Sequence, residues 1–277
     1  MIDIKKLYFK HRKKQKYLFQ NLECHIQPGN IVGLLGKNGA GKTTLLKIIT
    51  GLLSQESGMV EISGYNPIKR NVDFLSQLFF ISEEFSLPAI SSDNYVKIHA
   101  GFYPHFDHSL FSKLLREFEL ESIKNIHKYS YGQKKKFLIS FALATKCKTL
   151  ILDEPTNGLD IPSKSVFRKV VAGSLDDDQL VIISTHQVKD VENLIDKIIM
   201  LDQGKFILES DLYELSSLFN FKYSNTPDVP DVIYSEPIPG GYKVITSEKE
   251  TYSSVDIELL FNAITTGSLN IHDYVHE

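Results

Sequence analysis

Cysteine, long apolar runs and an excess of charge of either sign are all scarce in this sequence of 277 residues. The two cysteines, Cys24 and Cys147, lie far apart in apolar contexts, which is typical of reduced core thiols in a cytoplasmic protein and excludes a disulfide framework. No apolar stretch approaches the roughly 18 residues that a membrane-spanning helix needs, and the N-terminus has no secretory hydrophobic region. We therefore expect a soluble protein that can still dock on a membrane partner.

The charge distribution gives no sign of a nucleic-acid partner. A formal net charge of −3 produces no overall field that would attract nucleic acid or lipid. Two local basic runs, residues 10–16 and 134–136, are more typical of solvated faces than of a binding site. With 42% hydrophobic and 23% charged residues, the chain has the composition of a globular protein with an ample core.

Residues 31–46 combine a short apolar run, a glycine-rich loop and the start of a helical pattern. The loop reads Gly-x-x-x-x-Gly-Lys-Thr, in which glycines let backbone N–H groups turn onto a phosphate and the next helix adds its positive dipole end. Lys42 can reach the β- and γ-phosphates of a nucleotide, and the Thr43 hydroxyl can bind Mg²⁺. The predicted nucleotide-binding residues here are Gly36, Asn38, Gly39, Ala40, Gly41, Lys42, Thr43 and Thr44.

Polar residues follow two other apolar strand patterns. Asp153 and Glu154 end the run 149–152, at the carboxyl end of a strand, where open α/β sheets bind ligands. Asp153 can bind Mg²⁺, and Glu154 can orient or deprotonate the attacking water, although two such acids also suit a turn or a helix cap. His186 follows the run 180–184 and can reach the same edge, although a single histidine is often structural. Glu154 and His186 are the candidate catalytic residues.

The pattern of apolar residues predicts an α/β fold. Residues 2–9 and 17–26 predict an antiparallel pair of strands, and later core-type strands alternate with helices as in a mostly parallel sheet. A helical insert is expected at about 90–145, with Asp107 as the N-cap of one helix. The other expected strands are 59–63, 78–81, 149–153, 180–184 and 197–201.

The last sixty residues differ from the rest. A helix is expected at 211–219, followed by a linker at 225–231 that contains two prolines. A strand–turn–strand pattern over 232–246 and a helix over 253–266 come next, the helix with a possible capping box of Ser253 and Asp256. We therefore expect two domains, an ATP-binding domain over 1–220 and a small accessory unit without a catalytic pattern over 221–277.

Several motifs in order give the chain a family resemblance. Residues 129–134, Tyr-Ser-Tyr-Gly-Gln-Lys, resemble the Leu-Ser-Gly-Gly-Gln signature of ABC transporter ATPases, 157–160 resemble the D-loop, and 184–186 resemble the switch histidine. Over roughly residues 2–218 the chain resembles the ATP-binding subunit of an ABC transporter. The resemblance implies a P-loop NTPase sheet with an antiparallel β subdomain and an inserted helical subdomain, to which a small α+β C-terminal appendage is added. It also implies ATP and Mg²⁺ as cofactors.

The resemblance further implies a head-to-tail dimer around two ATP molecules, each held between one subunit's phosphate loop and the other's signature. Ser130, Gly132 and Gln133 would meet the γ-phosphate, and Asp160 would communicate between the sites. Both a homodimer and a heterodimer remain open. A separate transmembrane permease subunit would hold the protein at the inner face of the cell membrane, and residues 101–107 resemble those of export-type ATPases.

Three positions depart from the family pattern. Tyr131 replaces a signature glycine, and we expect its phenol to tilt away from the phosphate path. Glu83, 41 residues after Lys42, stands where the family has a metal- or water-coordinating glutamine, with Gln77 as the competing candidate. His11 aligns best with the aromatic residue that stacks on adenine, with Phe9 as the alternative.

Two other functions are compatible with parts of this pattern. A soluble ABC-type ATPase of DNA repair or translation is disfavoured, because only 88 residues without a cysteine separate Lys42 from Ser130 and the chain has one ATPase unit. Tyr131 and Glu83 would also suit a regulatory module that binds nucleotide without hydrolysing it. Steady-state ATPase measurement distinguishes this module from a transporter subunit.

Overall fold

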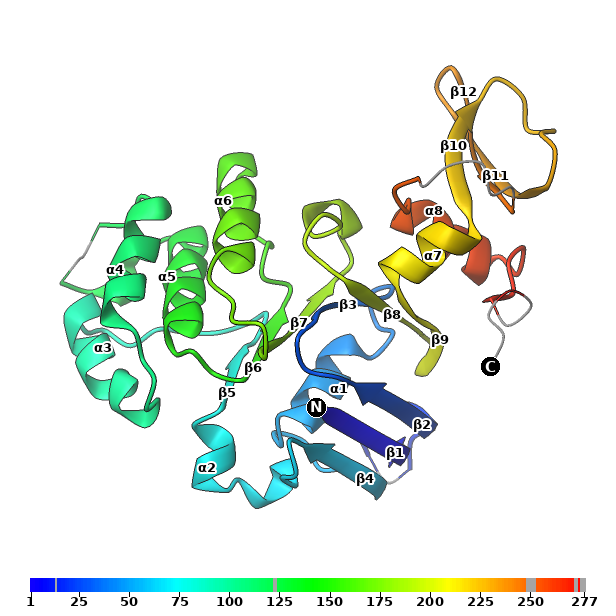
Figure 1. Cartoon of the computed structure of the whole chain (residues 1–277). Helices are drawn as coiled ribbons and strands as arrows, with labels where there is room; N and C mark the ends of the chain where they lie inside the picture. The colour runs from blue at the N-terminus through cyan, green and yellow to red at the C-terminus, as the bar shows by residue number, and fades with distance from the viewer. Residues whose placement is uncertain (13, 122–123, 248–252, 272–273, 275–277) are drawn as a thin grey trace.

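A six-stranded sheet forms the centre of the computed structural model, which describes every residue except 13, 122–123, 248–252, 272–273 and 275–277 (Figure 1). The strand order is β5-β6-β7-β3-β8-β9. All neighbours pair in parallel except β9, which is antiparallel to β8, so the predicted mostly parallel sheet is confirmed. The strands are β3 (Ile31–Leu35), β5 (Leu78–Ile81), β6 (Thr149–Asp153), β7 (Leu180–Thr185), β8 (Lys197–Asp202) and β9 (Lys205–Asp211).

A second, antiparallel sheet of order β2-β1-β4 lies beside α1 (Lys42–Ile49) in Figure 1. It contains β1 (Ile2–Phe9), β2 (Phe19–Ile26) and β4 (Ser57–Ile62), and the pairing of β1 with β2 confirms the antiparallel pair expected from the sequence. Apolar side chains of this sheet, of α1 and of one face of the large sheet form one buried cluster. The phosphate loop therefore connects two well-packed elements.

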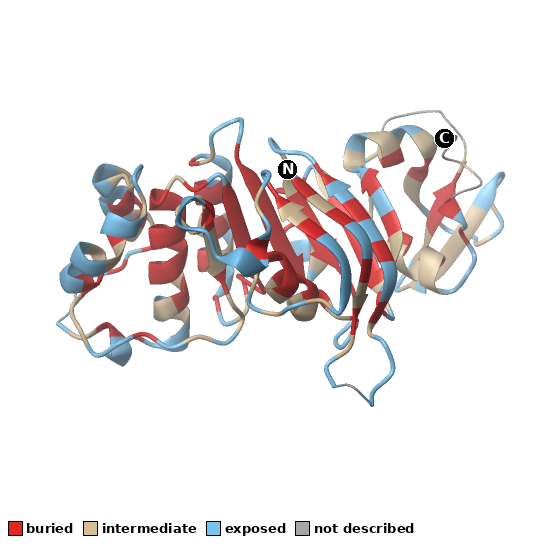
Figure 2. Ribbon diagram, turned by 90° about the horizontal axis from the view of Figure 1, so that it is seen from below, coloured by how far each residue is buried: buried red, intermediate tan, exposed pale blue. Residues whose placement is uncertain are grey.

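Helices cover the other side of the large sheet. The expected helical insert contains α3 (Ser92–His99), α4 (His108–Glu117) and α5 (Tyr131–Ala144), and Asp107 caps α4 as predicted. Helix α5 is mostly buried, as Figure 2 illustrates for this side of the molecule. Helix α6 (Ile161–Ala172) also lies on this side, whereas Phe74 of α2 (Val72–Leu75) belongs to the buried cluster of the antiparallel sheet. Short 3₁₀ turns lie at Pro67–Lys69, Ala100–Phe102, Ile126–Lys128 and Val188–Asp190.

The C-terminal part forms a small sheet of order β10-β12-β11. Its elements are α7 (Leu212–Leu218), β10 (Asn220–Ser224), β11 (Val232–Ile238), β12 (Gly241–Thr246) and α8 (Ile257–Thr265). The capping box with Ser253 is wrong, because Asp256 caps α8 while the Ser253 hydroxyl oxygen accepts the Phe221 N–H at 2.8 Å. Strands β9 and β10 were not predicted at all. Within the described parts of the chain, no helix is long and apolar enough to cross a bilayer.

Candidate nucleotide-binding site

The phosphate loop joins β3 to α1 in the predicted strand–loop–helix arrangement. Gly41 is the N-cap of α1 with a φ of 111°, in a left-handed region that favours glycine. A Cβ at Gly36 would lie 2.3 Å from the Leu201 carbonyl oxygen. The loop can therefore take its path only with glycine at these positions, which leaves the first N–H groups of α1 at its mouth.

Lys42 is the cation of this loop. Its Nζ donates to the Gly36 carbonyl oxygen at 2.7 Å and lies 3.9 Å from Glu154 Oε1. Burial lowers the pKa of Lys42, while the carboxylates of Glu154 and Asp153 act against this shift. If a phosphate binds in the loop, the Lys42 ammonium can therefore replace its carbonyl partner with a charged phosphate oxygen.

Thr43 and Asp153 form a pair of oxygen donors suited to Mg²⁺. The Thr43 hydroxyl donates to Asp153 Oδ2 at 2.8 Å, and the other carboxylate oxygen accepts the Ser184 hydroxyl. Among the described residues, no group of three or more His, Cys, Asp or Glu side chains could hold a metal by itself. The pair fits Mg²⁺, which prefers oxygen and takes part of its coordination from water and nucleotide phosphates.

Glu154 and His186, the two candidate catalytic residues, are in contact. His186 Nδ1 lies 2.8 Å from Glu154 Oε1, and the Thr185 hydroxyl donates to Glu154 Oε2 at 3.3 Å. The Glu154 backbone has a φ of 47°, and its N–H donates to the Ser184 carbonyl oxygen at 3.1 Å. The carboxylate is almost fully buried, with both oxygens engaged, beside the phosphate loop.

One cavity of about 790 Å³ is lined by Lys42, Thr43, Glu154 and His186, whereas the buried Asp153 lies behind Thr43 and is not among the lining residues. Glu83 lines it, whereas Gln77 lies before β5, at the opposite end of that strand. His11 lines it as well, with Nε2 3.5 Å from the Thr44 hydroxyl, whereas Phe9 is buried against Phe19. The lining residues are His11, Leu18, Lys37, Asn38, Gly39, Gly41, Lys42, Thr43, Thr44, Glu83, Glu154, Asn157 and His186.

Asn157 is a lining residue that sequence reasoning missed as a site residue. Its amide nitrogen donates to Glu83 Oε1 at 3.2 Å, which holds the glutamate side chain at the cavity. Only its place four residues after Asp153, within the D-loop pattern, could have suggested this role.

The predicted signature residues do not reach the cavity of their own chain. The Ser130 hydroxyl oxygen accepts the Gln133 N–H at 3.2 Å, and the Gln133 side chain accepts the Ser130 N–H at 2.9 Å, a complete capping box at the start of α5. Asp160 caps α6 through its Oδ1 atom, which accepts the Ser163 N–H at 3.0 Å, and its hydrogen bonds with Ser163 lower its pKa. Ser130, Gln133 and Asp160 are exposed, and Gly132 is partly exposed.

The basic run 134–136 is not a solvated face throughout, so that expectation is wrong for Lys135. This side chain is fully buried, and its Nζ donates to the Glu154 backbone carbonyl at 2.7 Å. Burial lowers the pKa of Lys135 to about 8. The hydroxyl of Tyr131, four residues earlier, donates to the Glu83 carbonyl oxygen of the same chain at 2.8 Å.

Comparison with known proteins identifies the family of this chain. The family model described as ABC transporter matches residues 19–157. The lantibiotic transport ATP-binding protein SrtF of Streptococcus pyogenes is 31% identical over 223 residues, which are 79% of this chain and 94% of that protein. The ABC transporter ATP-binding protein NatA of Bacillus subtilis is 27% identical over 75% of this chain and 87% of its own length.

Solved structures show the same fold. An ATP-binding subunit of an ABC transporter superposes with a TM-score of 0.69 at 24% identity, over 78% of this chain and 91% of that one. A dimeric ATP-binding cassette in a post-hydrolysis state, bound to ADP and Pi, gives 0.65 at 23% identity, over 76% and 99%.

The strand–loop–helix site on this sheet defines a P-loop nucleotide-binding protein. With the family model and the relatives above, the chain belongs to the ABC transporter family, as an ATP-binding subunit with ATPase activity.

Proposed function

We propose that this subunit dimerises around two ATP molecules and drives a separate membrane-spanning permease, in an export system. The observation that carries this proposal is the convergence of Lys42, Glu154 and His186 on one cavity, where the Glu154 carboxylate lies 3.9 Å from Lys42 Nζ and 2.8 Å from His186 Nδ1. Relatives named for lantibiotic transport and for SkfA peptide export support the direction of transport. The permease would hold the subunit at the inner face of the membrane.

In this proposal the cavity residues divide the chemistry of ATP hydrolysis. Lys42 and the N–H groups at the start of α1 bind the β- and γ-phosphates, and His11 faces the base. Thr43, Asp153 and Glu83 would hold Mg²⁺, which neutralises phosphate charge when bound. Glu154 accepts the proton of the attacking water, and His186 fixes the orientation of that carboxylate through the 2.8 Å contact.

The second half of each site would come from the other subunit. Ser130, Gly132 and Gln133 lie at the exposed start of α5, whose N–H groups suit a phosphate that approaches from outside the chain. Asp160 starts α6 two residues after Gly158, beside the same surface, and would link the two sites. A homodimer is the simpler arrangement, because one chain carries both halves, and a heterodimer remains the alternative.

The dimer can be tested on the Glu154→Gln variant, which should bind ATP without consuming it. We expect this variant to elute as a dimer from a sizing column with ATP and Mg²⁺, and as a monomer without nucleotide. A monomer under both conditions would contradict the proposed dimer.

Residues 221–277 lie outside the match of the family model. As part of the same proposal, we assign them to a small accessory unit at the C-terminus.

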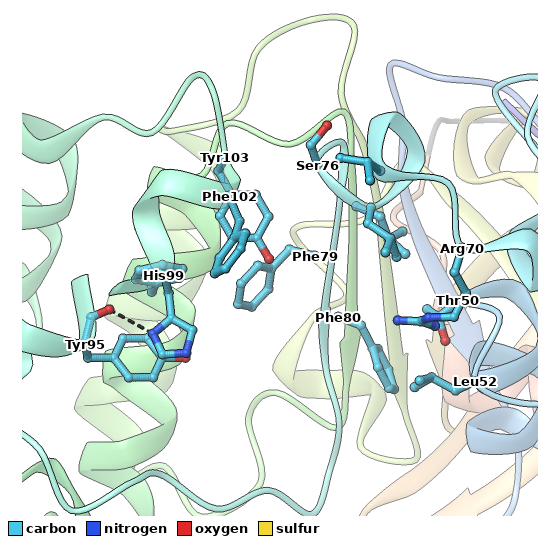
Figure 3. A pocket seen from close by; sticks show the side chains of 14 residues that line it. Thr50, Leu52, Arg70, Ser76, Phe79, Phe80, Tyr95, His99, Phe102 and Tyr103 are labelled. Carbon is cyan, nitrogen blue, oxygen red and sulfur yellow. Dashed lines mark hydrogen bonds between the residues drawn. The ribbon is translucent and has the colours of Figure 1, made fainter. Parts of the chain in front are cut away.

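An apolar groove of about 680 Å³ is the surface on which we place the permease contact (Figure 3). Phe79 and Phe80 of β5 form its floor, between Tyr95, His99, Phe102 and Tyr103 on one side and Leu52 and Arg70 on the other. Exposed apolar side chains at its rim include Val72 at 79% and Phe102 at 67%. Such exposure in a patch indicates an interaction site.

The groove suits a cytoplasmic segment of the permease that carries apolar side chains. Its floor strand, β5, ends at Ile81, two residues before Glu83 in the nucleotide cavity. A partner seated on β5 would therefore contact the strand that positions a cavity residue, which is the connection that transport coupled to ATP requires.

Phe102→Asp is expected to reduce copurification with a co-expressed permease at least tenfold. A charge in the apolar groove would have to be desolvated on docking. The melting temperature should stay unchanged, because Phe102 is 67% exposed. The matched control is Ile98→Asp on α3, which is 55% exposed but does not line the groove. Equal copurification of both variants with the native level would remove the groove from the contact.

A further inference from the structure

The Tyr131 side chain connects three segments of its own chain. Its hydroxyl donates to the Glu83 carbonyl oxygen at 2.8 Å, and its ring stacks on Phe85 with the centroids 5.5 Å apart. A Cβ at Gly158 would lie 2.5 Å from the Tyr131 Cδ1 atom, so the ring also lies directly against the segment after Glu154. The start of α5 is therefore in contact with both segments that flank the nucleotide cavity.

Lys135, one turn further along α5, extends this contact to the catalytic candidate. Its Nζ lies 5.4 Å from the Tyr131 ring centroid and 5.6 Å from that of Phe85. The same ammonium donates to the Glu154 backbone carbonyl at 2.7 Å, with no part of Lys135 exposed to solvent. A buried ammonium requires such a partner, and Glu154, with a φ of 47°, has a backbone conformation that needs support.

We propose that Tyr131 and Lys135 are positioning residues, which tie the signature end of α5 to Glu154 and Glu83 of the same chain. The inference rests on the proposed dimer, in which Ser130 at that end contacts the ATP of the partner subunit. ATP bound across the interface then fixes the catalytic glutamate of the other site. The two ATP sites depend on each other through these side chains.

Tyr131→Phe tests the link by removing one hydroxyl while it keeps the ring. In steady-state ATPase assays over a range of ATP concentrations, we expect kcat to fall about three- to tenfold, the worth of one hydrogen bond. KM should stay within about twofold, because Tyr131 does not line the cavity that holds the nucleotide. The Hill coefficient for ATP should fall from above one in the native protein towards one.

Tyr129→Phe is the matched control. The Tyr129 hydroxyl also donates to a backbone carbonyl, that of Glu121, but its ring packs in the core on Phe137. This variant loses the same kind of bond and should keep the native kcat and Hill coefficient. Equal kinetic changes in both variants would mean that only the stability of the helix matters, and would overturn the proposal.

A double-mutant cycle tests whether Tyr131 and Lys135 act together. If they form one link, the loss of kcat in the combined Tyr131→Phe and Lys135→Met variant should be smaller than the product of the separate losses. Independent losses would overturn the shared link. Should Lys135→Met not fold, the comparison of Tyr131→Phe with Tyr129→Phe still decides between the two outcomes.

Two further results separate this inference from the proposed function. If Glu154→Gln forms the ATP-dependent dimer while Tyr131→Phe behaves as the native protein, only the inference fails. If no dimer forms, the proposed function fails and the link between sites fails with it. A gain of about a hundredfold in Tyr131→Gly would show that the ring blocks the site, and would also overturn the positioning role.

Discussion

ATP turnover is expected to fall by about 10²–10⁴ when Glu154 is replaced by glutamine, the usual worth of a general base. The amide keeps the shape of the side chain but cannot take a proton from water. ATP binding should persist, because the phosphate contacts come from the loop and Lys42. Release of inorganic phosphate and nucleotide binding by calorimetry, measured on the same preparation, check the two parts separately.

Glu84→Gln is the matched control for this experiment. Glu84 is exposed and does not line the cavity, although it neighbours Glu83 in sequence. Its turnover should equal that of the native protein. Native turnover in Glu154→Gln itself would remove Glu154 from the mechanism and leave His186 as the remaining candidate base.

The Lys42→Ala variant is expected to bind ATP at least fivefold more weakly, which corresponds to about 1 kcal/mol or more. The substitution removes the ammonium whose Nζ lies 2.7 Å from the Gly36 carbonyl oxygen at the centre of the phosphate loop. It also leaves Glu154 without the cation 3.9 Å away, which adds repulsion against the incoming phosphates. Titration calorimetry with ATP and Mg²⁺ measures the change.

Lys47→Ala provides the comparison, because Lys47 belongs to the last turn of the same helix, far from the loop. It removes one positive charge and should leave ATP affinity native. Unchanged affinity in Lys42→Ala would mean that this loop is not the nucleotide site, and the assignment of the whole cavity would then fail.

The sequence predicted the parts of the site that depend on neighbouring residues. Strand, glycine loop and helix follow one another between Ile31 and Ile49, so local pattern was sufficient there. Asp153 and His186 could be placed at one edge because Asp153 ends one buried strand and His186 directly follows another, and parallel strands end on the same side. Strands β5 to β8 were equally predictable, since each is built around a run of apolar residues, whereas the edge strand β9 was not predicted.

The rest depended on contacts between distant segments. The run 134–136 predicts three solvated lysines, because nothing in the sequence shows that Lys135 is the one that points to Glu154. Strand β10 was missed because Asn220–Ser224 has mixed polarity and becomes a strand only by pairing with β12. The start of α8 was misplaced because Ser253 accepts a hydrogen bond from Phe221, more than thirty residues earlier.

The close approach of Tyr131 to Gly158 restricts how this protein can diverge. A methyl group at position 158 would overlap the tyrosine ring, so Gly158 cannot gain a side chain while Tyr131 is kept. Descendants that retain Tyr131 should retain Gly158, and a side chain at position 158 should occur only where position 131 has become small. Natural variation at these two positions should therefore be correlated, although 27 residues separate them along the chain.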